Sequence, residues 1–85
     1  MRITLTKYIL SVFDGTVLKV KIYSKDVKAK HKQLGNTPYA KIDTRQWIKN
    51  QVVNAIGEEE YNRLFRNFDY DPATGQMIAS NITRV

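Results

Sequence analysis

Alternating apolar and polar residues predict a β-hairpin at the N-terminus. Residues 2–13 have the alternation of one strand, and residues 16–23 have that of a strand returning beside it. Asp14-Gly15 is typical of a two-residue hairpin loop, since a type I′ turn needs positive φ at both central positions. This register predicts a core face made of Leu5, Ile9, Phe13, Leu18, Val20 and Ile22. Lys7 is the polar exception there, while Tyr8 and Tyr23 lie on the outer face.

The residues after the hairpin have the spacing of a short basic helix. Val27, His31 and Leu34 recur at i, i+4 and i+7, which makes a narrow apolar stripe. Ser24 is suited to the N-cap and Gly35 to the C-cap. We therefore expect a helix between these two residues, with an extended basic loop as the alternative.

Two further helices are predicted on either side of Gly57. Residues 36–39 indicate a turn, and Asp43 with Gln46 three positions later matches a capping box, so the first helix should begin after Asp43. Its apolar face is Trp47, Ile48, Val52, Ala55 and Ile56. The glutamates at 58–60 suit the positive end of the second helix dipole. The apolar face of that helix is Tyr61, Leu64, Phe65 and Phe68.

The C-terminal residues predict a second, smaller hairpin. Residues 71–75, with proline early and glycine late, are typical of a turn across which 68–70 and 76–79 pair. The tail from residue 80 alternates weakly and is expected to add a strand. The fold class is therefore α+β: an N-terminal hairpin, a short basic helix or loop, two packed helices and a C-terminal hairpin or strand. With 85 residues, we expect one small basic domain over residues 1–85.

Composition excludes several classes of site. The absence of cysteine excludes disulfides and thiolate metal sites, and it permits the cytoplasmic location that we expect. No apolar run approaches the roughly 20 residues of a membrane span, so we expect no membrane contact. His31 has no partner ligands at metal spacing, and successive helical glutamates at 58–60 point about 100° apart. We expect no metal, no cofactor and no catalytic residues.

The charge is concentrated in one part of the chain. Residues 1–35 carry eight cations and two anions, a balance of +6, whereas residues 36–85 carry six of each. Between residues 19 and 32, Asp26 is the single acid, and the lysines are Lys19, Lys21, Lys25, Lys28, Lys30 and Lys32. Such segregation indicates a field directed at an anionic partner. Lysine suits phosphate contacts that carry little base information. The alternative is a solvated face that discourages aggregation.

Tyr8 and Tyr23 lie among these lysines, so they are candidates for stacking on unpaired bases. In the alternative, they are ordinary cross-strand neighbours of lysine. A helix-turn-helix is rejected, because the second helix would present the glutamates at 58–60 to phosphate. These residues favour a non-enzymatic nucleic-acid-binding protein, with RNA preferred over DNA, which could act as an RNA-dependent inhibitor of a host factor.

Two other functions stay open from the sequence. The first is a protein-binding inhibitor or adaptor, of the kind that phages and mobile elements encode, whose basic patch meets an acidic or nucleoprotein partner. Trp47 or the tyrosines would then anchor the contact, although a core position is the more common role for a residue such as Trp47. The second is a small toxin-like ribonuclease that uses His31, for which a packed or surface histidine is the alternative.

Overall fold

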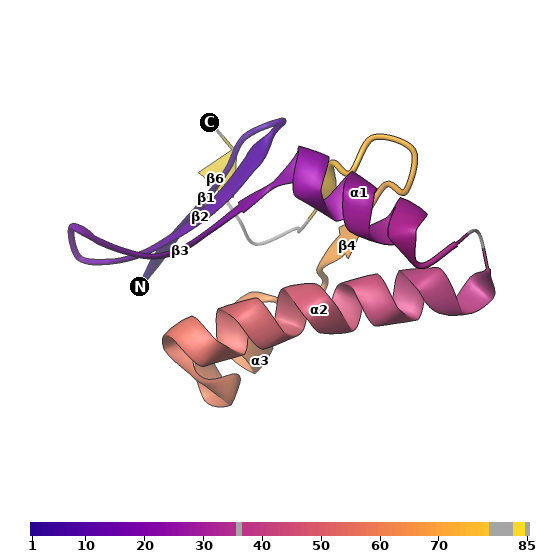
Figure 1. Cartoon of the computed structure of the whole chain (residues 1–85). Helices are drawn as coiled ribbons and strands as arrows, with labels where there is room; N and C mark the ends of the chain where they lie inside the picture. Colours follow the sequence, from indigo (N-terminus) through magenta and orange to yellow (C-terminus); the bar gives the residue numbers. More distant parts are fainter. Residues whose placement is uncertain (36, 79–82, 85) are drawn as a thin grey trace.

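The computed structural model describes residues 1–35, 37–78 and 83–84 (Figure 1). In chain order, its elements are β1 (Arg2–Leu5), β2 (Ile9–Asp14), β3 (Val17–Tyr23), α1 (Ser24–Gln33), α2 (Pro38–Ile56), α3 (Glu58–Leu64), β4 (Asp69–Tyr70), β5 (Met77–Ile78) and β6 (Thr83–Arg84). This arrangement confirms the predicted α+β class, with an N-terminal antiparallel sheet, helices and a short C-terminal strand pair.

The main sheet has the strand order β3-β2-β1-β6, and β4 pairs with β5 in a separate small sheet. β1 and β2 and then β2 and β3 are antiparallel, while β6 runs parallel to β1. The predicted C-terminal strand is thus confirmed at Thr83–Arg84, and the rest of the tail lies outside the described residues. Figure 1 shows α2 and α3 on one side of the main sheet, and no helix of the described residues covers the opposite face.

The predicted single strand over residues 2–13 is wrong, because the chain folds back at Thr6–Tyr8. The Thr6 hydroxyl accepts hydrogen bonds from the backbone N–H groups of Tyr8 and Ile9, at 3.2 and 2.9 Å. The Thr6 N–H also donates to the Ile9 carbonyl at 2.9 Å. A short polar side chain here satisfies the backbone locally and competes with the extended strand. Lys7, the polar exception on the predicted core face, lies inside this turn.

The loop between β2 and β3 lies one residue later than predicted. Asp14 pairs with Val17, so the loop residues are Gly15 and Thr16. Only Gly15 has positive φ here, at 61°, which matches a turn with glycine first and spares Asp14 a left-handed conformation. A loop at Asp14-Gly15 would pair Phe13 with Thr16, whereas Phe13 pairs with Leu18, so the predicted register is wrong. The register then shifts between Val12 and Phe13, which leaves Lys19 without a partner in β2.

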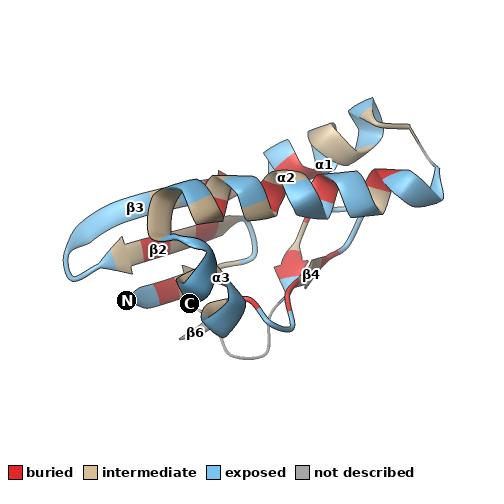
Figure 2. Cartoon of the chain, turned by 90° about the horizontal axis from the view of Figure 1, so that it is seen from below, coloured by how far each residue is buried: buried red, intermediate tan, exposed pale blue. Residues whose placement is uncertain are grey.

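The turn and the register shift change which side chains reach the core (Figure 2). Leu5 and Ile22 are buried as predicted, and Val20 packs against the core from its edge. However, Leu10 and Val12 are buried in place of Ile9 and Phe13, and Leu18 is 47% exposed. A one-residue change in strand parity exchanges the two faces of a sheet, which accounts for these errors.

The predicted basic helix is confirmed as α1, and its apolar stripe faces inward. Val27 is fully buried, while His31 and Leu34 are half-buried. Ser24 is the first helical residue instead of the N-cap, which is Tyr23, and the Ser24 hydroxyl donates to the Lys7 carbonyl. Gly35 follows the C-cap residue Leu34 with φ of 81°, the conformation that glycine commonly supplies there.

α2 begins six residues before the predicted start, so the predicted N-cap at Asp43 is wrong. Thr37 is the N-cap residue and Pro38 starts the helix, where a missing N–H costs nothing. Thr44 is buried inside the helix because its hydroxyl donates to the Ala40 carbonyl at 2.7 Å. Within the described part of the chain, no helix is both long enough and apolar enough to cross a membrane.

The core lies between the sheet and the helices and is closed by the C-terminal hairpin. Ile48 and Val52 of α2 are fully buried, as predicted. α3 ends at Leu64, so Phe65 and Phe68 are buried from the segment after it and make an edge-on ring contact with centroids 5.6 Å apart. The other buried apolar side chains include Ile3, Leu5, Leu10, Val12, Ile22, Val27, Tyr70 and Met77.

The turn before β5 packs directly on the start of α1. Gly75 is buried with φ of 73°, and its N–H donates to the Asp71 carbonyl at 2.7 Å. A Cβ at Gly75 would overlap the Ser24 carbonyl and lie 2.9 Å from the backbone nitrogen of Lys28. The predicted glycine-closed turn is confirmed, and its glycine is also required by this close approach.

We expect Gly75→Ala to lower the free energy of unfolding by at least about 3 kcal/mol, because strain at positive φ is added to a backbone clash. Gly15→Ala is the matched control, since Gly15 also has positive φ but nothing lies within 4 Å of its added Cβ. It should cost only about 1 kcal/mol. Urea unfolding of both variants measures the difference, and equal losses would contradict the close approach of the turn to α1.

Candidate nucleic-acid interface

Residues from three parts of the N-terminal half meet at one corner of the molecule. The Ser24 N–H donates to the Tyr8 carbonyl at 2.7 Å, and the Ser24 hydroxyl donates to the Lys7 carbonyl at 3.2 Å. These bonds hold the β1–β2 turn against the junction between β3 and α1. We name the resulting surface the basic–aromatic corner, which consists of Lys7, Tyr8, Lys21, Tyr23 and Lys25.

Ammonium groups lie close to both aromatic rings of the basic–aromatic corner. The Nζ atoms of Lys21 and Lys25 are 5.5 and 5.6 Å from the centroid of the Tyr23 ring. Lys7 Nζ is 5.5 Å from the centroid of the Tyr8 ring, and Tyr8 is 65% exposed. Two tyrosines and three cations are therefore brought together, as a site that binds both bases and phosphates requires.

The four lysines of α1 do not form one surface. Lys25, Lys28 and Lys32 have i, i+3, i+7 spacing, so they share one stripe of the helix, and all three are exposed. Lys30 is half-buried on another side of α1, with Nζ 6.0 Å from the Trp47 ring centroid. Lys19 is exposed at the bulge in β3. The structure thus brings Lys21 and Lys25 to Tyr23 and separates Lys30 from them.

The open face of the sheet adds residues that sequence reasoning missed. Arg2 pairs with Phe13 across β1 and β2, on the same face as Lys21 and Tyr23. The Arg2 guanidinium carbon is 4.9 Å from the Phe13 ring centroid. This pair continues the alternation of cation and aromatic ring across the sheet. This pairing depends on the turn between β1 and β2. The polar residues Thr6-Lys7, inside an otherwise alternating segment, were the signal in the sequence for that turn.

His31 is held in a contact between α1 and β4. Its Nδ1 atom shares a hydrogen bond with the Tyr70 hydroxyl at 2.7 Å, and the two rings meet edge-on with centroids 5.7 Å apart. Tyr70 is buried, so the bond satisfies a hydroxyl that water does not reach. Among the described residues, no group of three or more histidine, aspartate or glutamate side chains is arranged to hold a metal ion. A structural role for His31 is the reading that this geometry favours.

Trp47 is half-buried where α2 meets α1, and it packs against the core from its edge. With Lys30 over its ring, Trp47 is neither a fully buried core residue nor a freely exposed anchor.

Comparisons of the chain with models of protein families, with curated proteins and with solved structures each found no match.

We expect Tyr70→Phe and His31→Leu each to lower the free energy of unfolding by about 1–2 kcal/mol, because each leaves a polar partner unsatisfied. The double variant should lose less than the sum of the two, by about 1 kcal/mol, which denaturant titration measures. RNA binding should be unchanged in all three variants. A cleavage activity of the wild type that vanished in His31→Leu would contradict the structural role.

Proposed function

We propose that this protein is a non-enzymatic, cytoplasmic nucleic-acid-binding protein that holds single-stranded RNA at the basic–aromatic corner. The observation that carries this proposal is the position of two ammonium groups, from Lys21 and Lys25, within 5.6 Å of the Tyr23 ring. A single strand presents a phosphate and an unstacked base within each nucleotide. Lysines beside the half-buried Tyr23 match both groups at once.

Stacking of a base on Tyr23 or Tyr8 is favourable even though lysines lie over the rings. An exposed cation–π contact contributes roughly 0.5–1 kcal/mol, whereas a base stacked on an aromatic side chain contributes roughly 1–3 kcal/mol. Lysine has a long, flexible stem, so its ammonium can move from the ring to a phosphate. The same lysine thus contacts the tyrosine ring in the free protein and a phosphate in the RNA complex.

A strand leaving the basic–aromatic corner would follow α1. Lys28 and Lys32 continue the exposed stripe that begins at Lys25, and backbone phosphates are the groups that such a stripe suits. The base edges of a duplex are reached by a helix or a strand pair that enters a groove, and α3 does not suit this role. It has seven residues and starts with three glutamates. The corner therefore favours a single strand over a duplex.

A protein-binding inhibitor or adaptor is the second candidate function. On α2, Tyr39 and Ile42 are 71% and 63% exposed and lie three positions apart, so they share one side of the helix. Aromatic and apolar groups of this kind are common in protein interfaces. An acidic or nucleoprotein partner that covered them would make the two functions compatible.

We expect binding to single-stranded RNA to weaken with salt, with a slope of log K against log salt between about −2 and −3.5. These limits correspond to three and five lysine–phosphate contacts at about −0.7 for each. A salt titration of nuclease-treated protein against single- and double-stranded RNA and DNA of equal length measures the slope. Absence of binding at low salt would contradict the proposal and favour the protein-binding candidate.

We expect Lys21→Gln/Lys25→Gln to make that slope shallower by about 1.4, since two phosphate contacts are lost. Lys30→Gln is the matched control, because Lys30 also belongs to α1 but lies over Trp47, and the slope of this variant should equal that of the wild type.

We expect Tyr23→Ala to weaken the binding of single strands by about 1–3 kcal/mol and the binding of duplexes much less. Equal losses on both ligands would exclude stacking, and circular dichroism verifies that each variant is folded.

A further inference from the structure

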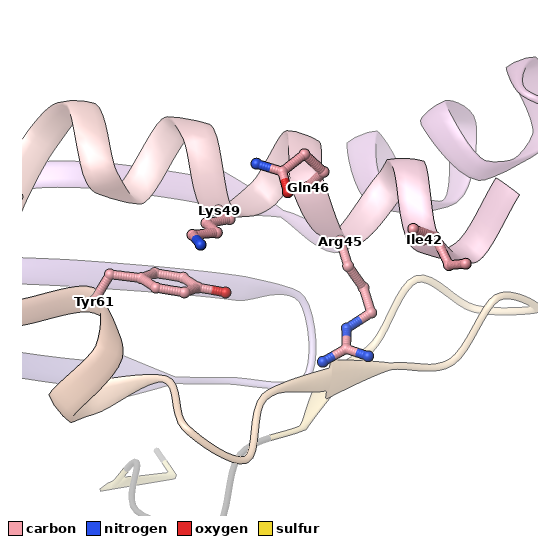
Figure 3. Close-up of a pocket in the computed structure, with 5 residues that line it drawn as sticks. All are labelled: Ile42, Arg45, Gln46, Lys49 and Tyr61. Carbon is pink, nitrogen blue, oxygen red and sulfur yellow. The ribbon is translucent and has the colours of Figure 1, made fainter. Parts of the chain in front are cut away.

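A second basic surface lies on the helical side of the molecule, away from the basic–aromatic corner. It is an open pocket between α2 and α3, to which α2 contributes Arg45, Gln46 and Lys49 and α3 contributes Tyr61 (Figure 3). The pocket continues past Asn62 of α3 to Phe65 and Arg66, which follow that helix. We name this surface the arginine pocket.

The side chains that line the arginine pocket include three cations and no carboxylate. Two acids lie nearby. Glu58 has its Oε1 atom 3.8 Å from Lys49 Nζ and its side chain is 68% exposed. Asp69 pairs with Lys41 at 3.3 Å, and against the opposing effect of burial, hydrogen bonds from the Tyr70 N–H and Lys41, together with the charges of Lys41 and Arg45, hold its pKa below the usual value. Arg45, Lys49 and Tyr61 line both parts of the arginine pocket, and Arg66 lines the part beside α3. All four side chains carry N–H or O–H donors. The site is complementary to a compact anion, although residues 36–85 have no net charge as a whole.

Arg45 is held in place but keeps most of its donors. Its Nη2 atom donates to the Phe68 carbonyl at 3.2 Å, which anchors the guanidinium to the segment before β4. A guanidinium has five N–H donors, and within the described residues this is the one protein hydrogen bond that Arg45 makes. Arg66 is exposed and forms no ion pair with a described residue. The guanidinium groups of Arg45 and Arg66 are therefore both available to one ligand.

Tyr61 contributes its hydroxyl to the arginine pocket instead of its ring. Phe65 stacks on the ring at 5.2 Å between centroids and 7° between planes, and Lys49 Nζ lies 5.5 Å from the ring centroid. Figure 3 shows the hydroxyl directed along the pocket on the side of Arg45. Burial raises the pKa of Tyr61, so the phenol is protonated at neutral pH and can donate. These contacts disfavour a stacked base and favour a small polar group.

We propose that the arginine pocket binds a phosphate group, through Arg45 and Arg66 with help from Lys49 and Tyr61. Paired arginines match the oxygens of phosphate in a bidentate manner, and three cations suit a dianion better than a single carboxylate. The phosphate could belong to a small phosphorylated molecule or to the 5′ end of an oligonucleotide. The site goes beyond the proposed function, because none of the corner residues contributes to it.

The test is a titration of the isotope-labelled protein with inorganic phosphate, followed by nuclear magnetic resonance at constant ionic strength set with chloride. We expect saturable shifts at Arg45, Tyr61 and Arg66. Arg45→Gln should weaken binding at least about tenfold, the effect of losing one hydrogen bond to a charged group. Tyr61→Phe, which keeps the ring contact with Phe65, should weaken it by a smaller factor.

Arg63→Gln is the matched control from α3. Its guanidinium is exposed and donates to Glu60 at 2.6 Å, which lowers the pKa of Glu60, and it does not line the pocket. Phosphate binding should be unchanged in this variant and also in Lys21→Gln/Lys25→Gln. The inference fails if wild-type shifts do not saturate, or if Arg63→Gln loses as much affinity as Arg45→Gln.

Two further ligands identify the source of the phosphate. An oligonucleotide with a 5′-phosphate that binds more tightly than the same oligonucleotide with a 5′-hydroxyl, with the gain lost in Arg45→Gln, assigns the pocket to a nucleic-acid end. Equal affinities, with saturable binding of inorganic phosphate, assign it to a small phosphorylated molecule. A glutamate-rich peptide that bound the pocket more tightly than phosphate would overturn the inference in favour of an acidic protein partner.

Discussion

The backbone around Ser24 is the junction on which the rest of the structure depends. Its N–H and hydroxyl bind the carbonyls of the β1–β2 turn, and its own carbonyl lies against Gly75 of the C-terminal turn. Ser24 is buried, so these backbone groups satisfy one another where water cannot. One residue thus joins three segments that are far apart in the chain, and it also determines where α1 leaves the sheet.

The same junction positions the basic–aromatic corner. Tyr23 and Lys25 flank Ser24 in sequence, and Lys7 and Tyr8 are brought to them by the bonds that Ser24 makes. The flexible lysine side chains therefore extend from a backbone that is held in place by its contacts with the β1–β2 turn and with Gly75. Such support limits the conformational freedom that a ligand has to remove on binding, although the charged side chains themselves stay exposed. Local structure and candidate function depend on the same few hydrogen bonds.

Short-range patterns predicted the helices and the glycine-closed turn at Gly75, because periodicity and turn chemistry act within a few residues. They failed at Thr6, whose hydroxyl forms a local turn inside an alternating segment, and at the bulge beside Lys19. Each error changed strand parity, so the predicted faces were partly exchanged. Tyr8 and Tyr23 still came together, but through the fold at Thr6–Tyr8 and not through the predicted register. The cation–aromatic pair of Arg2 and Phe13 depended on that fold and was not foreseen.

Charge along the chain is a poor guide to charge in space. The lysine-rich segment is divided, because helix geometry turns Lys30 toward Trp47, whereas the electrically balanced half contains the arginine pocket. At physiological salt, exposed charges farther apart than about 8 Å are largely screened, so a ligand responds to its nearest neighbours and not to a segment total. The two basic surfaces also differ in kind. Flexible lysines beside tyrosines suit a mobile nucleic-acid strand, whereas an arginine anchored on the Phe68 carbonyl suits one compact anion. The type of cation therefore distinguishes the two surfaces more clearly than the number of cations on each.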